Sequence, residues 1–325
     1  EPAQEALSPC MAACPAGVDI RGNHYLIQQG HLGEAARRYR SVQPFPAITG
    51  RVCFHPCEEK CARNHVDEAV NINAVEQIMG DWDLKAPLEK PARRHITKVA
   101  VIGSGPAGLS CAWFLAQMGY PVTVFEAMPL PGGMLRYGIP AYRLPDAIVA
   151  AHIARLEAMG IGEGADLSLS DLKRLGFKAV MLAPGTTVSR KVRMEGVELP
   201  GVHWGLEFLR ANRGDEQPRL SGDVLVIGGG DVAVDAAITA KRLGAAKVSM
   251  ACLESRETMP AYPHNQADAL REGIECHCGF GPGTILQENG HVAGMELKTC
   301  IRVVDEQGRF APLFDENATM RIRAD

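Results

Sequence analysis

The stretch "VAVIGSGPAGLSCAWFLAQMGYPVTVFEA", residues 99–127, decides the fold. An apolar strand pattern leads into Gly103, Gly105 and Gly108, spaced as G-x-G-x-x-G, and a helical pattern follows. The first glycine permits a tight turn, the second lets the backbone approach a pyrophosphate, and the third allows close packing of helix on strand. A second strand ends at Glu126, whose carboxylate can accept both ribose hydroxyls. Because these features agree, we predict a Rossmann unit that binds an adenine dinucleotide rather than a glycine-rich turn that binds nothing.

A second unit of the same kind opens with "DVLVIGGGDVAVDAAITAKRLGA". Gly228, Gly230 and Ala233 fill its three positions, with alanine in the packing role. The next strand, "KVSMACLE", ends at Glu254, where a carboxylate hydrogen-bonds a free 2′-hydroxyl and repels a 2′-phosphate. We therefore predict NAD(H) over NADP(H), a preference that Arg256 could soften. The alternative is that Glu254 is an ordinary solvated acid.

Two such units in one chain indicate two dinucleotides held face to face. A flavin in the first unit and a nicotinamide in the second is the usual pairing, because hydride can then pass directly between the rings. The predicted fold class is α/β, with two Rossmann-like, doubly wound dinucleotide-binding domains of the two-dinucleotide flavoprotein type.

Five of the ten cysteines lie in the first 61 residues. "SPCMAACP" carries Cys10 and Cys14, and "GRVCFHPCEEKC" carries Cys53, Cys57 and Cys61 at four-residue intervals. In a cytoplasmic chain, clustered cysteines more often bind metal or do redox chemistry than form disulfides. Structural zinc favours C-x2-C or C-x4-C pairs, which this spacing fits poorly. The pattern therefore favours a cubane iron–sulfur cluster, which needs four ligands.

Composition excludes several function classes. A chain of 325 residues, 46% hydrophobic and 22% charged, predicts two or three globular domains. The net charge of −4 gives no sign of a nucleic-acid-binding surface. No apolar run reaches the ~18 residues of a membrane span, and the N-terminus lacks the features of a secretion signal. We therefore predict a cytoplasmic protein. Because the chain begins without Met and stops at "MRIRAD", we expect flanking residues to be missing at both ends.

Three segments follow one another along the chain. Residues 1–95 bear the clustered cysteines and are mostly helical in pattern, so they predict an α-helical [4Fe-4S] domain. A polar, proline-containing linker at 83–97 connects this domain to the next segment. Residues 96–215 hold the first Rossmann unit, the first segment of an FAD-binding domain. Residues 216–325 hold the second unit, an NAD(H)-binding domain.

Several motifs resemble one family. The most specific are "PGGMLRYGIPAYRLP" (131–145) and the triple-cysteine stretch, while "IGGGDVAVDAAITAKRLGA" followed by "ESRETMPA" matches the family's nicotinamide half. The chain thus resembles the glutamate synthase small (beta) subunit family of FAD, NAD(P) and [4Fe-4S] oxidoreductases. Relatives in that family include the large subunit of the bifurcating NADH-dependent ferredoxin:NADP oxidoreductase and the N-terminal part of dihydropyrimidine dehydrogenase. The resemblance covers almost the whole chain.

The resemblance implies binding roles for the residues of both glycine loops. It places Gly103, Gly105, Gly108 and Glu126 at the FAD pyrophosphate and ribose, Gly132, Gly133, Met134 and Arg136 near the flavin, and Gly228, Gly230, Ala233 and Glu254 at NAD. The family's FAD domain is completed after the NAD(P) domain, so the return segment is expected beyond residue 325. Members that use NADPH resemble "YRR" where this chain has "CLES", which agrees with the electrostatic argument for NAD(H).

The resemblance also implies metal ligands. Cys14, Cys53 and Cys57 match the cluster nearest the flavin, and Glu76 falls where relatives place a non-cysteine fourth ligand. The alternative is that four of the five clustered cysteines surround a single cluster and that Glu76 is only a solvated helix residue.

Cys10 and Cys61 match a second, outer cluster. The other two positions of that cluster correspond to Pro2 and Glu5, which carry no thiolate. We expect one [4Fe-4S] cluster, or two if ligands come from elsewhere.

The leading hypothesis is an electron-transfer flavoprotein subunit. Hydride passes between NAD(H) and FAD, and the cluster exchanges single electrons with a separate subunit, such as a glutamate synthase large subunit or a metal-containing dehydrogenase. No side chain need act as acid or base, so no catalytic residue is named. The alternatives are the NADPH-dependent glutamate synthase small subunit proper, a free-standing FAD disulfide reductase and a non-catalytic assembly subunit.

The disulfide reductase would need a close redox-active cysteine pair beside the flavin. Residues 98–325 contain no C-x-x-C or C-x4-C, and we interpret "ECHC" (275–278) as core packing.

Overall fold

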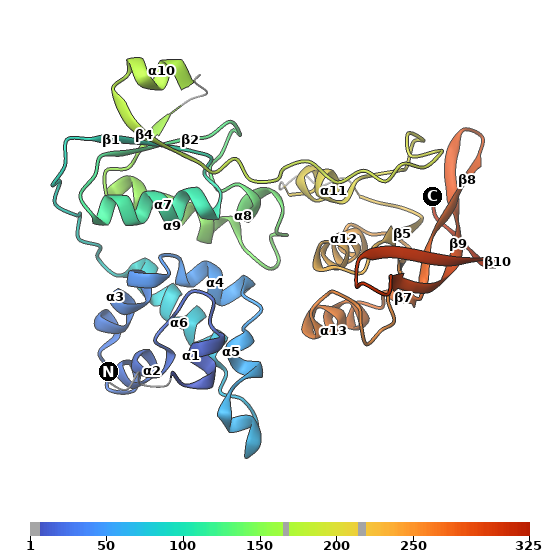
Figure 1. The fold of residues 1–325 in the computed structure, drawn as a ribbon, viewed down its shortest axis with the longest axis horizontal. Coiled ribbons are helices and arrows are strands. Elements are labelled where there is room, and N and C mark those ends of the chain that lie inside the picture. The colour runs from blue at the N-terminus through green and yellow to red at the C-terminus, as the bar shows by residue number, and fades with distance from the viewer. Residues whose placement is uncertain (1–6, 165–168, 214–218) are drawn as a thin grey trace. The chain divides into compact units, whose positions relative to one another are not determined.

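The computed structural model describes residues 7–164, 169–213 and 219–325. The chain divides into two compact units, Glu1–Thr186 and Thr187–Asp325. The first unit begins with helices and continues as an α/β layer. The second combines a parallel and an antiparallel sheet (Figure 1).

The start of the first unit is helical, as the sequence predicts. Its elements are α1 (Pro9–Ala13), α2 (Ile20–Gln28), α3 (Leu32–Val42), α4 (Pro46–Val52), α5 (Pro56–Glu59), the 3-10 helix η1 (Ala62–His65) and α6 (Ile72–Lys85). Helix α3 shows why: Ala35, Ala36 and Tyr39 recur at helical spacing, and all three are buried in a shared core.

The predicted linker at 83–97 starts later than expected, because α6 continues to Lys85. Asp83, which is 1% exposed, pairs with Arg40 of α3 and lies 2.9 Å from Arg155 Nη1. A buried carboxylate must be paired, and this double pairing holds the end of α6 in place.

The α/β part of the first unit contains a four-stranded sheet. Its elements are β1 (Lys98–Ile102), α7 (Pro106–Gln117), β2 (Val122–Phe125), α8 (Met134–Tyr137), α9 (Asp146–Ala158), β3 (Gly162–Gly164), α10 (Leu169–Arg174) and β4 (Phe177–Leu182). The strands are parallel, in the order β3-β2-β1-β4. Helices α7 and α9 cover one face, and α10 lies on the other (Figure 1). This is the predicted Rossmann arrangement.

The helical and α/β parts of this unit share one core. Phe45, the N-cap of α4, and Ile48 of α4 are buried in one cluster with Trp113 of α7. Leu144, just before α9, and Val149 of α9 belong to the same cluster. Both parts therefore fold as one compact unit. The domain limits at 95/96 and 215/216 remain predictions.

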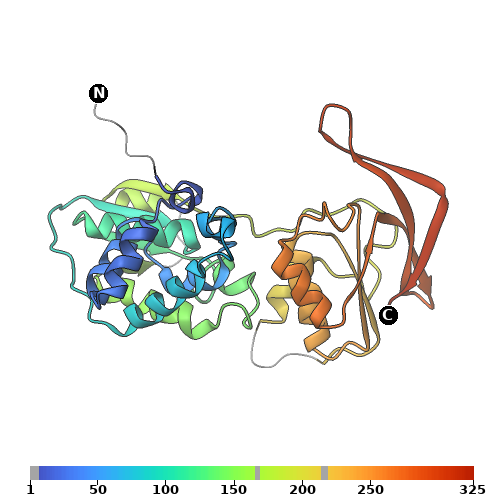
Figure 2. The same cartoon turned by 90° about the horizontal axis from the view of Figure 1, so that it is seen from below.

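The second unit begins with α11 (Gly205–Ala211) and then repeats the Rossmann pattern. Its elements are β5 (Asp223–Ile227), α12 (Asp231–Arg242), β6 (Lys247–Cys252), α13 (Pro263–Arg271) and β7 (Glu275–Cys278), with parallel strand order β5-β6-β7. Three antiparallel strands follow: β8 (Phe280–Glu288), β9 (His291–Val304) and β10 (Phe310–Arg323). In Figure 2 the long β9–β10 hairpin, drawn in red, extends beyond the parallel sheet. This antiparallel sheet is an addition to the predicted architecture.

Candidate functional site

The three glycines of the first loop differ in how much space a side chain would find. Two positions are crowded by neighbouring backbone atoms, and one is open. Gly103 has φ +101°, and a Cβ there would lie 2.2 Å from the carbonyl oxygen of Ala183, just after β4. A Cβ on Gly108 would lie 1.9 Å from the Gly103 carbonyl oxygen. At Gly105, the N-cap of α7, a Cβ would meet nothing within 4 Å. The crowded glycines close the turn against the sheet, and the open one leaves room for a phosphate at the helix N-terminus.

The segment around Gly132 and Gly133, which we predicted to approach the flavin, lies against this loop. Gly132 and Gly133 have φ of +132° and +52°, which favour glycine. A Cβ on Gly133 would be 2.6 Å from the Cα of Gly105, and the Gly132 amide donates to Ser104 Oγ at 2.8 Å. The structure therefore brings together two stretches that lie about thirty residues apart in the sequence.

Ser104 connects the loop to the acid at the end of β2. It is fully buried, and both its amide (2.9 Å) and its hydroxyl donate to Oε2 of Glu126. The Met128 amide donates to Oε1 at 2.8 Å. Burial acts to raise the pKa of Glu126, but these hydrogen bonds hold the pKa below its usual range. Glu126 is therefore an oriented anion. Glu126 was predicted from the sequence, whereas Ser104, which occupies an x position of the glycine motif, was not.

Met134 and Arg136 both lie in α8, next to the glycine pair. The Arg136 guanidinium donates from Nε to the Pro131 carbonyl oxygen at 2.9 Å and from Nη1 to Asp146 at 3.4 Å. These bonds tie the loop to the start of α9. In this structure Arg136 is thus a positioning residue for the loop.

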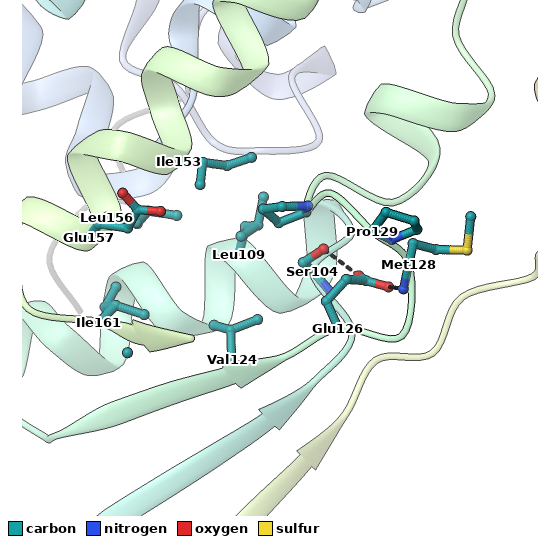
Figure 3. Close-up of a pocket in the computed structure, with 12 residues that line it drawn as sticks. Ser104, Leu109, Val124, Glu126, Met128, Pro129, Ile153, Leu156, Glu157 and Ile161 are labelled. Atoms are coloured by element: carbon teal, nitrogen blue, oxygen red, sulfur yellow. Dashed lines mark hydrogen bonds between the residues drawn. The ribbon is translucent and has the colours of Figure 1, made fainter. Parts of the chain in front are cut away.

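A cavity of about 180 Å³ opens beside Glu126 (Figure 3). Its walls are mostly apolar, and Ser104 and Glu126 supply polar groups where the strand ends. The apolar side chains that line it are Leu109, Val124, Met128, Pro129, Pro131, Ile153, Leu156 and Ile161. Apolar walls with a few oriented polar groups are typical of ligand sites, and this one suits the adenosine end of a dinucleotide.

The second glycine loop repeats the geometry of the first. Gly228 has φ +142°, and its Cβ would lie 3.2 Å from the Cβ of Ala233. Gly230, the N-cap of α12, is open: a Cβ there would meet nothing within 4 Å. Glu254 follows β6, and its Oε2 would lie 3.1 Å from a Cβ on Gly229. The acid thus lies against the loop, as expected for a ribose-binding carboxylate.

The N-terminal cysteines come from separate helices that pack together. Cys10 lies in α1 and Cys14 is its C-cap, while Cys53 follows α4 and Cys57 lies in α5. Burial raises the pKa of the Cys57 thiol to about 12, and Cys53, Glu58 and Cys14 add to the effect as neighbouring anionic groups. Neighbouring thiols whose negative forms repel one another need a positive centre to become thiolates together. This donor set fits an iron–sulfur cluster.

The buried hydroxyl of Tyr39 also supports an iron–sulfur cluster at these cysteines. Tyr39 is 1% exposed, and among the described residues its hydroxyl has no hydrogen-bond partner. Burial raises the pKa of Tyr39, and the negative forms of Glu76, Cys57 and Cys14 raise it further. Tyr39 shares one core cluster with Cys57, and Cys14 packs against that cluster. A buried donor without a partner is rare. The sulfur of a bound cluster, or a cysteine that holds it, would accept this hydrogen.

Glu76 on α6 is half-buried rather than solvated. Its Oε1 accepts hydrogen bonds from Thr49 Oγ1 and Gln43 Nε2, and burial raises its pKa. Its role as a ligand stays a prediction, as does the outer pairing of Cys10 with Cys61. Pro2 and Glu5 lie outside the described residues.

One group of cysteines was not predicted. Cys252, Cys276 and Cys278 have their sulfur atoms within 4.8 Å of one another. The alternation of β7 puts its two thiols on one face, and Cys252 of the neighbouring strand meets them there. Only the register between the parallel strands β6 and β7 brings these three cysteines together. The sequence alone does not give this register, so it carries no signal for the group.

Comparisons with known proteins agree with this geometry. Residues 97–309 match the family "Pyridine nucleotide-disulphide oxidoreductase". The chain belongs to the pyridine nucleotide-disulphide oxidoreductase family. Residues 4–87 match the dihydropyrimidine dehydrogenase domain II, 4Fe-4S cluster family. This oxidoreductase therefore joins an FAD/NAD(P) domain to a 4Fe-4S domain, and the predicted family resemblance is confirmed.

Curated relatives of this oxidoreductase include several complex subunits. The NADP(+)-dependent formate dehydrogenase subunit beta of Moorella thermoacetica is 36% identical over 343 residues, covering 94% of this chain and 48% of that protein. The NADPH-Fe(3+) oxidoreductase subunit beta of Geobacter sulfurreducens is 36% identical over 327 residues, with the same coverage. The NAD-dependent dihydropyrimidine dehydrogenase subunit PreT of Salmonella typhimurium is 33% identical, covering 85% and 69%. The chain spans about half the length of the first two.

Among solved structures, Mycobacterium tuberculosis FprA in complex with NADPH has a TM-score of 0.56 at 15% identity, over 71% of this chain and 69% of that one. The likeness confirms the two-dinucleotide-binding flavoprotein fold. Within the described residues, no helix of this oxidoreductase has the length and apolar character needed to cross a membrane.

Proposed function

We propose that this chain is part of an electron-transfer subunit that exchanges hydride between NAD(H) and FAD and passes single electrons through a [4Fe-4S] cluster to or from a partner subunit. One observation carries the proposal: two glycine loops, each with an open position at a helix N-terminus and an acid at the next strand end, occur in a chain whose residues 4–87 match a 4Fe-4S family. The names of the relatives, which are subunits of formate dehydrogenase and NADPH-Fe(3+) oxidoreductase, support a separate partner.

The residues of the chain bind and orient rather than transfer protons. The amide groups at Gly105 and Gly230 would face phosphates, and Glu126 and Glu254 would accept ribose hydroxyls. Cys14, Cys53 and Cys57, with Glu76 or another cysteine, would hold the metal. When bound, a flavin links two-electron hydride chemistry to the one-electron chemistry of iron and sulfur. The protein fixes where each group lies.

Glu254 determines the nicotinamide preference in this proposal, and we predict NAD(H). Replacing it in a Glu254→Gln variant removes the charge that repels a 2′-phosphate. The kcat/KM ratio for NADH over NADPH is expected to fall by about tenfold, since loss of one charge–charge contact is worth ~1–2 kcal/mol. Glu257→Gln, which changes an exposed acid of the same loop, is the matched control and should leave the ratio unchanged. An unchanged ratio in Glu254→Gln would remove this role.

The proposed activity is tested with the full-length protein that contains this chain, loaded with FAD and with iron and sulfide under anaerobic conditions. NADH should reduce a one-electron dye such as ferricyanide or a viologen without any added disulfide. Absence of turnover with FAD bound would instead support an assembly role. Turnover only with a disulfide substrate would support the disulfide reductase.

A further inference from the structure

Three thiols converge on one face of the parallel sheet in the second unit. Cys252 ends β6 and is the register partner of Cys278 in β7, and Cys276 lies two residues earlier on the same face. All three sulfur atoms lie within 4.8 Å of one another, and those of Cys276 and Cys278 are 3.5 Å apart. We name this group the thiol trio. It is separate in sequence from the cysteines assigned to the iron–sulfur cluster.

The spacing of the thiol trio fits a single ion. Thiolates bound at about 2.3 Å around a tetrahedral ion lie about 3.8 Å from one another, close to the separations present here. Thiolates select thiophilic cations over Mg²⁺ or Ca²⁺. In the described part of the chain, no fourth His, Cys, Asp or Glu joins the group at this distance. The site therefore offers three ligands and one open position, unlike the four ligands of a cubane cluster.

We propose that Cys252, Cys276 and Cys278 bind one thiophilic cation of the Zn²⁺ class, with water or a small ligand in the fourth position. Each thiol releases its proton to solvent as the metal–sulfur bond forms, so no oxidant or reductant is needed. Cys252 is 3% exposed, whereas the two thiols of β7 are only partly buried, so the ion has access from the side of β7.

The thiol trio lies next to the second glycine loop. A Cβ on Gly229 would be 2.8 Å from the Cβ of Cys252, and the Cys252 thiol lies 3.6 Å from the carbonyl oxygen of Glu254. An ion bound by the thiol trio would therefore fix the backbone that carries Gly229 and Glu254. It would thereby change the affinity of the second glycine loop for a dinucleotide, a consequence that rests on the proposed function.

Metal binding is measured directly with Cd²⁺ and Zn²⁺ on the full-length protein whose iron–sulfur cluster is already loaded. We expect one additional ion per chain and a near-ultraviolet sulfur-to-cadmium charge-transfer band. Cys276→Ser should weaken this binding at least about tenfold, because one of three ligands is lost. Cys300→Ser, which removes a thiol of β9 outside the trio, is the matched control and should bind normally. Equal uptake by Cys276→Ser and the unmodified protein would overturn the site.

Two further measurements keep the inference independent of how the variants fold. Zn²⁺ should protect the cysteines of the thiol trio in the unmodified protein from alkylation, as read by peptide mass spectrometry, and full alkylation in its presence would also overturn the site. In titrations of the unmodified protein, Zn²⁺ should change the Kd for NADH, and NADH should change the Kd for Zn²⁺ by the same factor. Metal uptake without this coupling would overturn only the link to the loop, whereas absence of any NADH binding would overturn the proposed function.

Discussion

A Gly105→Ala variant is expected to fold and to lose FAD. Gly105 has φ −69° and ψ −179°, which alanine adopts readily, and the added methyl group meets nothing within 4 Å in the protein. That space is where the pyrophosphate of a bound dinucleotide would lie. A methyl group forced into it should cost about 2–3 kcal/mol, or roughly 30- to 150-fold in FAD affinity, with little change in Tm of the flavin-free protein.

Gly230→Ala is the matched control, because this glycine is also extended, open and an N-cap. It should lose NADH binding while keeping FAD, the reverse of Gly105→Ala. Both affinities can be measured by fluorescence titration of the same preparations. If each variant bound both dinucleotides normally, the two loops would not be the cofactor sites.

A Cys57→Ser variant is expected to lose its iron and sulfide and to retain FAD. Cys57 is 8% exposed and lies in the core of the helical segment among the other clustered thiols. Without it a cubane cluster lacks a ligand, so iron content should fall by about four atoms per chain. Iron quantitation and the visible absorption of the cluster provide the readout.

Cys111→Ser is the control for Cys57→Ser, because Cys111 is a half-buried thiol of α7 outside the helical segment. Its iron content should be unchanged. Cys10→Ser distinguishes one cluster from two: loss of about half the iron indicates an outer cluster. Full iron retention in Cys57→Ser would contradict its role as a ligand.

The Rossmann units could be predicted from sequence because each of their signals is local. The strand before Gly103, the glycine spacing and the acid at Glu126 all lie within one short stretch, and the hydrophobic periodicity between them is strong. The end of α6 was predicted too early, because the interactions that hold it come from residues far away in the sequence. Asp83 reads as the start of a polar linker, yet Arg40 and Arg155 neutralise it from other helices.

The contacts that sequence could not supply are those between elements. In the sequence, Ser104 is only a variable position between two glycines. Its role becomes visible through its hydrogen bonds to Glu126 and Gly132 in the structure. Cys252 and Cys278 become neighbours only through the register of two parallel strands. The antiparallel sheet formed by β8–β10 was not predicted, because many of the side chains on these strands are only partly buried, which weakens the alternation on which strand prediction depends.

The common core formed by Phe45 and Ile48 with Trp113 limits how this protein can be taken apart or recombined. A fragment starting at residue 96 would expose apolar surface that α4 now covers, so the iron-binding helices are not an exchangeable module. If this unit holds both a cluster and a flavin, folding fixes the distance that an electron crosses between them. With a diffusing electron carrier, that distance would instead be set anew at each encounter.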